Sequence, residues 1–576
     1  MGLFSSLRLG ASALRAQQTG IQVTGQNLAN VNTAGYTRQR AHMSAISAPQ
    51  GASPPLAGRG VEVQRIARQV DEYLVTAIRN QGGSLQSLEE RDKIMQQVET
   101  ILNELGDNDL SSGMDAFFSA VQEWSSNPQD SGLREGVLQS ASLLSQRFNS
   151  LGTQLTDLRT NVNSEVSSAV DQINVLTSRI ANLNKGIVSL ESGNEVINGR
   201  DANDLRDQRD EALRQLAEIV NISVSEQATG SVTVSISGDY VVMDGKARAI
   251  ELSQEVVDGV SVTTPIFTDN LVPLNLRSGR LHGLMEARDT LVTDVIDDLD
   301  TLANAFMKEV NAIQTTGYGL QGYSTLTSWE TPTVATNIAL NQSGLSRSVA
   351  NGSFVIQVRN ANNGTVTPVQ IQVDADGIGF DTTLESLRDE INADMTSAGF
   401  NGITATINSK GRLVMESSNS SLTFSFTDDS SGALHALGWG AMFLGEGARG
   451  MSINAVLEGN TDFLAGGTTT AVADNTNILN LVSLRTTGVL AGDSQTLEEF
   501  YRGLVGNVGT NTARLHDTAA NQMAVVQSLE NERQAVSGVN VDEEIVNLMT
   551  YQRAFQGAAR YIGVVDELLD TLINGL

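Results

Sequence analysis

Residues 541–576, VDEEIVNLMTYQRAFQGAARYIGVVDELLDTLINGL, decide the fold of this chain. Apolar side chains recur in them every three or four residues, at Leu548, Tyr551, Phe555, Ala558, Ile562, Val565, Leu569, Leu572 and Leu576. This spacing predicts one long helix with a single apolar stripe, and a repeat near 3.5 residues favours packing against a partner helix. The alternative is an ordinary amphipathic helix on a globular core. The partner helix is preferred because the repeat runs to the last residue of the sequence.

Helical periodicity also dominates other parts of the chain. Near the N-terminus the apolar positions are Phe4, Leu7, Ala11, Leu14, Ile21 and Leu28. Longer stripes predict helices over about 133–190 and 497–536, and shorter ones predict helices over about 85–105 and 284–313. Asn127-Pro128 marks the break before the first of these. The longest of these helices far exceed the globular mean of about 11–12 residues and therefore predict a rod.

The centre of the chain is predicted to be rich in β-strands. Apolar and polar side chains alternate over residues 231–237, 240–243, 354–358, 369–373 and 422–426, between clusters of Gly, Asn, Asp and Ser. Helical segments come first and last in the chain, and the β-rich segments lie between them. The two terminal segments must therefore lie together. The predicted fold class is α+β and multi-domain: a long α-helical coiled-coil rod made from the N- and C-terminal segments, with inserted β-rich outer domains.

These patterns divide the chain into seven predicted segments. They are 1–65, a terminal helix plus extended chain; 66–220, the N-terminal part of a long-helix rod; 221–280, a β-rich segment; 281–316, a helix returning to the rod; 317–490, the β-rich outer domain or domains; 491–538, the C-terminal part of the rod; and 539–576, the terminal helix.

Composition excludes several classes of function. The 576 residues have a net charge of −29, which argues against nucleic acid as the main partner. Without cysteine there are no disulfides, thiolate metal sites or cysteine nucleophiles, and four scattered histidines leave little for metal or base chemistry. No run of 18 apolar residues exists, so no membrane insertion is expected. The first 20 residues are not expected to be a secretory signal, because Arg8 and Arg15 interrupt them.

Charge is distributed unevenly between the two ends. Residues 1–70 hold seven arginines and one acid, whereas the last 36 residues hold six acids and two arginines. Such runs are usually solvated faces, but here the basic head and the acidic tail are complementary.

No motif predicts catalysis, a cofactor or a metal site. Residues 317–322 and 445–450 match G-x-G-x-x-G, but neither lies in the strand–loop–helix frame that a dinucleotide site needs. Residues 374–385 resemble a calcium loop, yet Ile378 stands where a side-chain oxygen is required. The alternative there is a turn that leads into a short helix over 384–391. We therefore expect no catalytic, cofactor-binding or metal-binding residues, and a protein that is not an enzyme.

Three segments resemble a known family. Residues 27–39, NLANVNTAGYTRQ, are similar to the N-terminal signature of bacterial flagellar axial proteins, which comprise rod, hook and hook-associated proteins. Residues 539–556, VNVDEEIVNLMTYQRAFQ, and the helix after them resemble the C-terminal helix of that family. Residues 203–210, NDLRDQRD, resemble a motif of flagellins and hook-associated proteins. Rod and hook proteins normally lack this last motif and flagellins lack the first, so the combination resembles the hook-associated members.

This resemblance implies a structural subunit of the bacterial flagellum that self-assembles where the hook joins the filament. It also implies export through the flagellar type III apparatus and a secreted, extracellular location. The implied partners are further copies of the chain, the hook protein, a second junction protein, filament subunits and an export chaperone that holds the C-terminal region.

The residues at the two ends support such a role. Asn30, Asn32 and Gly35 are predicted to end the first helix, and extended chain follows from Tyr36. Asp542 is the predicted N-cap of the last helix. Packed against one another and against neighbouring subunits, the terminal stripes would line the inner wall of a tube. The predicted self-assembly residues are Phe4, Leu7, Leu14, Ile21, Leu28, Asn30, Asn32, Gly35, Tyr36, Ile545, Leu548, Tyr551, Phe555, Ile562, Val565, Leu569 and Leu572.

Three other interpretations remain open. A hook or other axial protein fits the termini, but residues 204–210 and the long paired helices weigh against it. A secreted adhesin or effector with coiled-coil stems explains the rod and the β domains but not residues 27–39. An enzyme is the least supported, because no convergent polar site is found.

Overall fold

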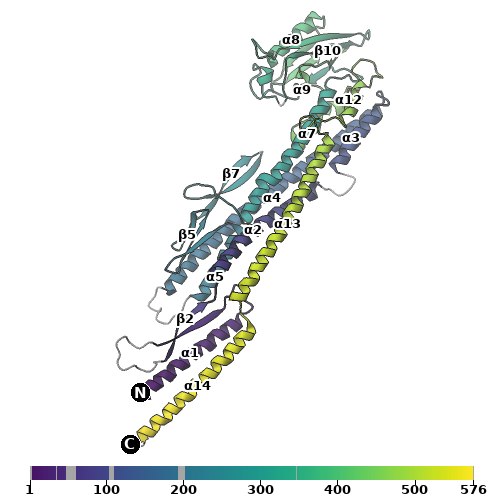
Figure 1. The fold of residues 1–576 in the computed structure, drawn as a ribbon. Helices are drawn as coiled ribbons and strands as arrows, with labels where there is room; N and C mark the ends of the chain where they lie inside the picture. Colours follow the sequence, from purple (N-terminus) through teal and green to yellow (C-terminus); the bar gives the residue numbers. More distant parts are fainter. Residues whose placement is uncertain are drawn as a thin grey trace. The chain divides into compact units, whose positions relative to one another are not determined.

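The computed structural model describes residues 3–33, 35–46, 60–102, 109–191, 202–257, 259–345 and 347–574. The chain forms two compact units: residues 1–95, 160–290 and 512–576 belong to unit 1, and residues 96–159 and 291–511 belong to unit 2. The predicted α+β, multi-domain fold class is confirmed, because long helices are combined with several small sheets (Figure 1). The division into seven segments stays a prediction.

Unit 1 contains the terminal helices and parts of three long ones that continue past its limits. Its helices are α1 (Leu3–Ala29), α2 (Glu72–Leu102), α4 (Ser131–Glu191), α5 (Asn203–Ile219), α6 (Arg280–Glu286), α13 (Leu497–Ser537) and α14 (Val541–Asn574), with a π-helical turn at Ala287–Leu291. The bounds of α4 and α13 agree with the predicted helices to within two residues.

The helix predicted over 85–105 begins earlier than the sequence indicated. α2 starts at Glu72 and runs through Gly82 and Gly83, two residues that weaken a helical pattern. Gly83 is required by packing, since a Cβ there would lie 2.6 Å from the carbonyl oxygen of Ala217 on α5. The predicted end of this helix, 103–105, lies outside the described residues.

Three small antiparallel sheets belong to unit 1. They are β1 (Gln39–Ala45) with β2 (Val61–Arg68); β3 (Ser223–Glu226), β4 (Val232–Ile236), β5 (Asp239–Met243) and β6 (Lys246–Ala247); and β7 (Ile250–Val257) with β8 (Val260–Phe267). In the first sheet Gln39 pairs with Arg68, which places the start of β1 beside the end of β2. The predicted β-rich segment 221–280 contains the other two.

Unit 2 combines three small antiparallel sheets with short helices. Its sheets are β11-β10-β14, β12-β13-β9 and β15-β16, formed by β9 (Thr325–Thr327), β10 (Gly352–Asn360), β11 (Val366–Val373), β12 (Ile403–Ile407), β13 (Leu413–Ser417), β14 (Leu422–Thr427), β15 (Phe443–Leu444) and β16 (Ser452–Ile453). Its helices are α3 (Leu110–Trp124), α7 (Val292–Gln314), α8 (Leu384–Ser397), α9 (Ala433–Leu437), α10 (Gly447–Gly450), α11 (Ala455–Gly459) and α12 (Thr476–Leu484), with 3₁₀ turns at Leu340–Gln342 and Thr461–Phe463.

Unit 2 differs from the sequence-based expectation in one region and agrees with it in two others. Residues 433–490, expected to be mainly β, are instead short helices and loops, because Phe443 and its neighbours pack against α7 and α3 as single buried residues rather than in long strands. The predicted break at Asn127-Pro128 is confirmed, since it separates α3 from α4. The calcium-like segment is the predicted turn before α8, which begins with a Thr383 capping box.

The two terminal helices pack against each other in opposite directions, as the sequence predicts, with both ends of the chain at the same end of the pair (Figure 1). The contact is made by small residues on α1 and large ones on α14. A Cβ added at Gly10 would lie 2.5 Å from Ile562 Cγ1, and one added at Gly20 would lie 2.8 Å from Tyr551 Cδ1. The predicted stripe of α14 therefore covers the glycine face of α1.

The stripe predicted on α1 is not the face that the rest of the chain buries. Phe4 is 75% exposed, and Leu7, Leu14, Ile21 and Leu28 are only half-buried. The buried positions are Gly10, Ala16, Gly20, Val23, Thr24 and Asn27. Apolar periodicity missed this face because close helix packing selects glycine and alanine, which carry almost no hydrophobic signal.

The apolar stripes of α14 and α13 are only partly buried. Val565 is buried and Leu548, Tyr551, Phe555, Ile562 and Leu569 are half-buried, but Ile545 and Leu572 are exposed. On α13, Leu497 to Leu515 follow the predicted burial, whereas Val525 and Val536 are exposed. Leu576 lies outside the described residues.

We expect Gly20→Leu to separate α1 from α14, because the new side chain would occupy the space of the Tyr551 ring. Hydrogen exchange of the α14 amides should become faster. Gly25→Leu is the matched control: the helix is the same, the gain in helix propensity is similar, and nothing lies within 4 Å of a Cβ at Gly25. Equal exchange rates in the two variants would contradict the glycine contact.

Candidate assembly site at the paired termini

Three segments that are remote in sequence meet at one place in unit 1. They are the end of α1 with the chain leading into β1, the first turns of α5, and the link from α13 to α14. These are the segments whose sequences resemble the flagellar family. Arg38 joins two of them directly, because its backbone N–H donates to the carbonyl oxygen of Ser537 at 3.0 Å.

Asn27 is the centre of the contact between α1, β1 and α14. Its side chain is buried and its amide makes four hydrogen bonds. Nδ2 donates to the Gln39 carbonyl oxygen (2.9 Å) and to Glu544 Oε2 (3.0 Å). Oδ1 accepts from the Gln39 N–H (3.0 Å) and from the Tyr36 hydroxyl (2.9 Å). The amide thus bonds both backbone groups of Gln39, as a neighbouring strand would, and has its full complement of partners.

Asp207 joins the chain before β1 to α5. Its carboxylate accepts from the Thr37 N–H (3.2 Å) and the Thr37 hydroxyl (2.5 Å), and it pairs with Arg68 at 2.7 Å. Arg68 also pairs with Asp210 at 2.8 Å. The side chains of Arg68 and Asp207 are 8% and 9% exposed, so this ion pair is largely shielded from water. Asn203 adds a bond from Nδ2 to the Ile66 carbonyl oxygen at 2.8 Å.

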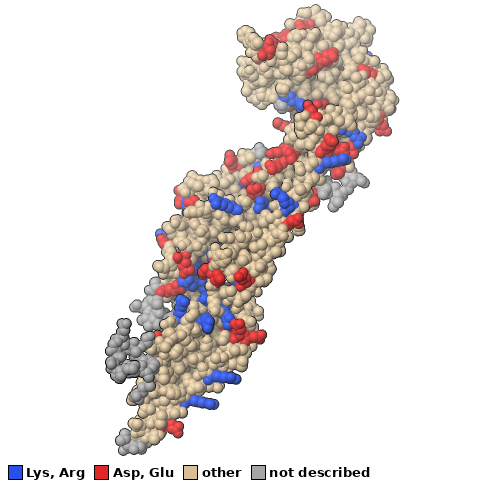
Figure 2. Space-filling view, in the orientation of Figure 1, with Lys and Arg blue, Asp and Glu red and all other residues tan. Residues whose placement is uncertain are grey.

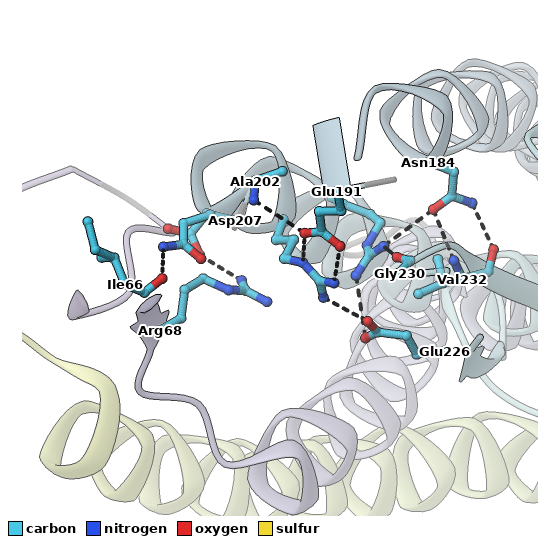
Figure 3. A network of polar contacts seen from close by, with 12 residues as sticks. Ile66, Arg68, Asn184, Glu191, Ala202, Asp207, Glu226, Gly230 and Val232 are labelled. Atoms are coloured by element: carbon cyan, nitrogen blue, oxygen red, sulfur yellow. Dashed lines mark hydrogen bonds and ion pairs between the residues drawn. The ribbon is translucent and has the colours of Figure 1, made fainter. Parts of the chain in front are cut away.

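The polar network continues through α5 to the sheet of β3–β6 (Figure 3). Arg206 binds Glu191 through two nitrogens at 2.8 Å and reaches Glu226 at 2.7 Å. The buried Arg209 donates to the Gly230 carbonyl oxygen at 2.7 Å. Asn203, Asp207 and Asp210 thus hold β2 and the chain before β1, whereas Arg206 and Arg209 hold β3 and the turn after it.

A salt bridge closes the site at the start of α14. Arg38 pairs with Glu543 at 2.8 Å and with the buried Glu544 at 2.7 Å, so the basic head does meet the acidic tail. The N-cap of α14 is Asn540, not Asp542 as predicted. Asn540 Oδ1 accepts from the Asp542 N–H at 3.0 Å, and Asp542 lies in the first turn. Asn and Asp cap helices equally well, so local sequence could not choose between them.

Burial and neighbouring charges shift the pKa values of Tyr36 and Arg68. Burial, followed by the carboxylates of Asp207 and Asp204, raises the pKa of Tyr36 well above its ordinary value. Burial lowers the pKa of Arg68, but Asp210 and Asp207 more than offset this and raise it. The Tyr36 hydroxyl therefore stays protonated as a donor to Asn27, and Arg68 stays charged.

A hollow and a carboxylate cluster are found among the described residues. A hollow of about 510 Å³ beside the site is lined by residues of both charges, among them Arg38, Arg40 and Glu543. In the described part of the chain, the carboxylates of Asp374, Asp376 and Asp381 form the one group close enough together to hold a cation. Asp376 and Asp381 accept hydrogen bonds from backbone N–H groups of their own turn, which explains the cluster structurally.

Families of known proteins match much of the chain. Residues 95–326 match the flagellar hook-associated protein FlgK helical domain, residues 532–575 match the flagellar basal body rod FlgEFG protein C-terminal family, and residues 7–37 match the flagella basal body rod protein family. Flagellar hook-associated protein 1 of Salmonella typhimurium is 27% identical over 98% of both chains. The protein of that name in Bacillus subtilis is 25% identical over 100% of this chain and 98% of its own. The chain thus resembles flagellar hook-associated protein 1 along nearly its whole length.

A solved structure agrees with this assignment at the level of the fold. The flagellar hook junction protein FlgK from Burkholderia pseudomallei is 19% identical, and the match covers 81% of this chain and all of that one with a TM-score of 0.51. No helix among the described residues is long and apolar enough to cross a membrane. Its similarity to flagellar hook-associated proteins places this chain with structural proteins of the bacterial flagellum.

The structure brings only some of the predicted assembly residues to the site. Tyr36 lies in it, and Gly35 lies beside Glu211 of α5 with a φ of +79°, the left-handed conformation that favours glycine. Asn30 caps the end of α1 by donating to the Gln26 carbonyl oxygen at 3.0 Å, and Asn32 is exposed. The stripe residues of α1 and α14 lie along the two helices and make none of the polar contacts of the network described above. Their role in assembly stays a prediction.

Sequence reasoning missed the residues that form the network: Asn27, Thr37, Arg38, Arg68, Asn203, Asp207 and Glu544. All of them except Arg68 lie within segments that carry the resemblance to hook-associated proteins or their relatives, so the resemblance was the available signal. Hydrophobic periodicity could not find them, because they are polar side chains whose burial depends on partners far away in sequence.

The pair of Glu191 and Arg206 predicts a pH dependence. The hydrogen bonds from Arg206 lower the pKa of Glu191. A carboxyl whose pKa is lower in the folded state stabilises it above the unfolded pKa, and loses that contribution as the pH falls through the folded value. We expect Glu191→Gln to flatten the loss of unfolding free energy between about pH 5 and 3, measured by denaturant titration. Glu255→Gln, at an exposed carboxylate on β7, is the control and should retain the wild-type slope.

Proposed function

We propose that this protein is a structural, non-enzymatic subunit that self-assembles at the junction of hook and filament and connects the two. Its paired terminal helices pack into the inner wall of the tube. The observation that carries the proposal is the convergence of the three family segments on one buried polar network. That network fixes the start of β1 and the start of α14 to α5 in a single arrangement.

The geometry suits a subunit that must present two helices in a defined direction. Salt bridges and hydrogen bonds restrict orientation more than apolar contacts do, because their donors and acceptors must align. The helix pair itself is held by glycine contacts along its length. Its partners in this proposal are its own copies, the hook protein, a second junction protein and filament subunits.

Transport to that location is part of the same proposal. The chain leaves the cell through the flagellar type III apparatus, and a chaperone holds its C-terminal region beforehand. Val546, Met549 and Val564 of α14 are exposed apolar residues. They support the proposal that the chaperone covers this helix before assembly.

Electron microscopy of isolated hooks tests the proposal. Hooks from cells that lack this protein are mixed with the purified chain, and the distal ends are examined. We expect a short added segment at the distal end, and binding of filament subunits only after the second junction protein is added. A chain without residues 2–30 should add nothing. Absence of the full chain from hook ends would refute the junction role.

A further inference from the structure

The outer face of α1 is exposed in the described part of the chain. Phe4, Arg8, Arg15 and Gln22 are exposed, and their spacing of 4, 7 and 7 places them on one side of the helix. This side is opposite to the glycines that face α14. Leu7 and Leu14, which the sequence analysis assigned to self-assembly, border it and are half-buried.

The outer face of α14 changes its charge along the helix. Arg553 and Arg560 are exposed on this face, followed by Val564, Glu567 and Leu568. On the side seen in Figure 2, basic atoms project along α14 and acidic atoms lie closer to its end. We call Asp566, Glu567 and Asp570, together with Val564 and Leu568, the acidic end of α14.

The two faces are complementary in charge and in apolar character. α1 contains Arg8 and Arg15 and no acidic residue, and no ion pair joins either arginine to another described residue. The acidic end contains three acids and no basic residue. Val564 and Leu568 are 56% and 54% exposed, and Phe4 is 75% exposed, so each face also offers apolar surface. Within one chain, Gly10 and Gly20 of α1 face α14, which leaves Arg8 and Arg15 on the far side of α1.

We propose that the outer face of α1 in one copy binds the acidic end of α14 in a second copy. Arg8 and Arg15 supply the positive charge of this contact, the three acids of the acidic end supply the negative charge, and Phe4, Val564 and Leu568 supply apolar surface. This inference rests on the proposed function, since it specifies the contact between copies that self-assembly requires.

The middle of α14 sets the register of this contact. Arg553 and Arg560 lie on the same side as Glu567, fourteen and seven residues before it, and repel a basic helix placed there. Only the last turns of α14 attract α1. The contact joins two different surfaces, so a row of bound copies has an unoccupied α1 face at one end and an unoccupied acidic end at the other. Further copies can therefore bind, and the row grows into a ring or an open helical tube.

Charge reversal on the two faces gives a direct test. The basic-face variant carries Arg8→Glu and Arg15→Glu, and the acidic-end variant carries Asp566→Arg and Glu567→Arg. Each is purified and mixed with isolated hooks, and the protein that sediments with the hooks is measured. Each variant alone places like charges in every contact, and we expect its incorporation to fall by about tenfold or more.

An equimolar mixture of the two variants should recover most of the wild-type incorporation. In an alternating array each contact pairs either the reversed α1 with the reversed α14 or the two natural faces, so all contacts are attractive. The chain with all four substitutions should also recover. Recovery in the mixture can arise only between copies, and it shows at the same time that both variants are folded.

Two controls separate this contact from other effects. Arg179→Glu with Arg277→Glu changes the net charge equally at exposed sites away from the terminal helices, and should incorporate as wild type. Since the chain has no cysteine, Arg15→Cys and Glu567→Cys chains can be mixed on hooks and treated with a short thiol crosslinker, which should yield dimers of the two.

Two results would overturn the proposed contact: single-face variants that incorporate as wild type, or a mixture that stays defective and gives no crosslinked dimers. Failure of the wild-type chain to bind hooks would instead refute the proposed function. If the wild-type chain binds hooks and charge reversal has no effect, the proposed function is retained and only the proposed contact is refuted.

Discussion

Asp207→Ala is expected to be among the most damaging single substitutions in unit 1, with a loss of about 3–5 kcal/mol of stability. The change removes the acceptor of the Thr37 N–H and hydroxyl and one partner of the buried Arg68. A guanidinium that is 8% exposed then keeps only Asp210, whose side chain is 27% exposed. Breaking a shielded ion pair costs more than the pair contributes, because a charge stays buried without compensation.

The control for this substitution is Asp204→Ala. Asp204 lies on the same helix and in the same motif, but it is exposed and no described hydrogen bond uses its side chain. Thermal unfolding should show a large shift for Asp207→Ala and a small one for Asp204→Ala. Hydrogen exchange at the Thr37 amide should accelerate only in the first. Similar shifts in both would mean that the carboxylate does not hold the chain before β1.

Asn27→Ala is expected to cost about 3 kcal/mol and to loosen the start of α14. The substitution leaves both backbone groups of Gln39 without their side-chain partner and removes one donor to Glu544. A buried backbone group that loses its partner pays its full desolvation penalty. Since Arg38 still pairs with Glu544, the helix itself should remain formed.

Asn30→Ala is the matched control, because Asn30 bonds only nearby groups at the end of α1. Exchange of the Gln39 amide and proteolysis between α13 and α14 should increase in Asn27→Ala and not in Asn30→Ala. If Asn27→Ala keeps the wild-type unfolding free energy, the amide is not a structural centre of the site.

The pairing of an asparagine amide with one strand residue recurs in the protein. Asn174 bonds both backbone groups of Ile250, and Asn184 does the same for Val232. In unit 2, Asn392 pairs in this way with Ala405. Small sheets leave many unpaired edge groups, and these amides satisfy some of them where a further strand is missing. No local pattern indicates which asparagines do this.

The sequence by itself determined the parts that depend on neighbouring residues. The bounds of α4 and α13, the break at Asn127-Pro128 and the helix at 541–574 follow from apolar spacing and helix-breaking residues. The mutual packing of the termini followed from the order of helical and β segments. The resemblance of three segments to flagellar axial proteins gave the family before any contact was known.

Only the tertiary structure decided which faces meet and which polar groups are buried. The face of α1 that contacts α14 includes Gly10 and Gly20, so apolar periodicity did not indicate it. Asp207 reads in sequence as one acid among several on an acidic helix, yet it is the one that binds Thr37 and Arg68. Hydrophobic periodicity indicates only which side chains are removed from water. Close packing of helices and the pairing of hydrogen-bond donors with acceptors depend on groups that only the fold brings together.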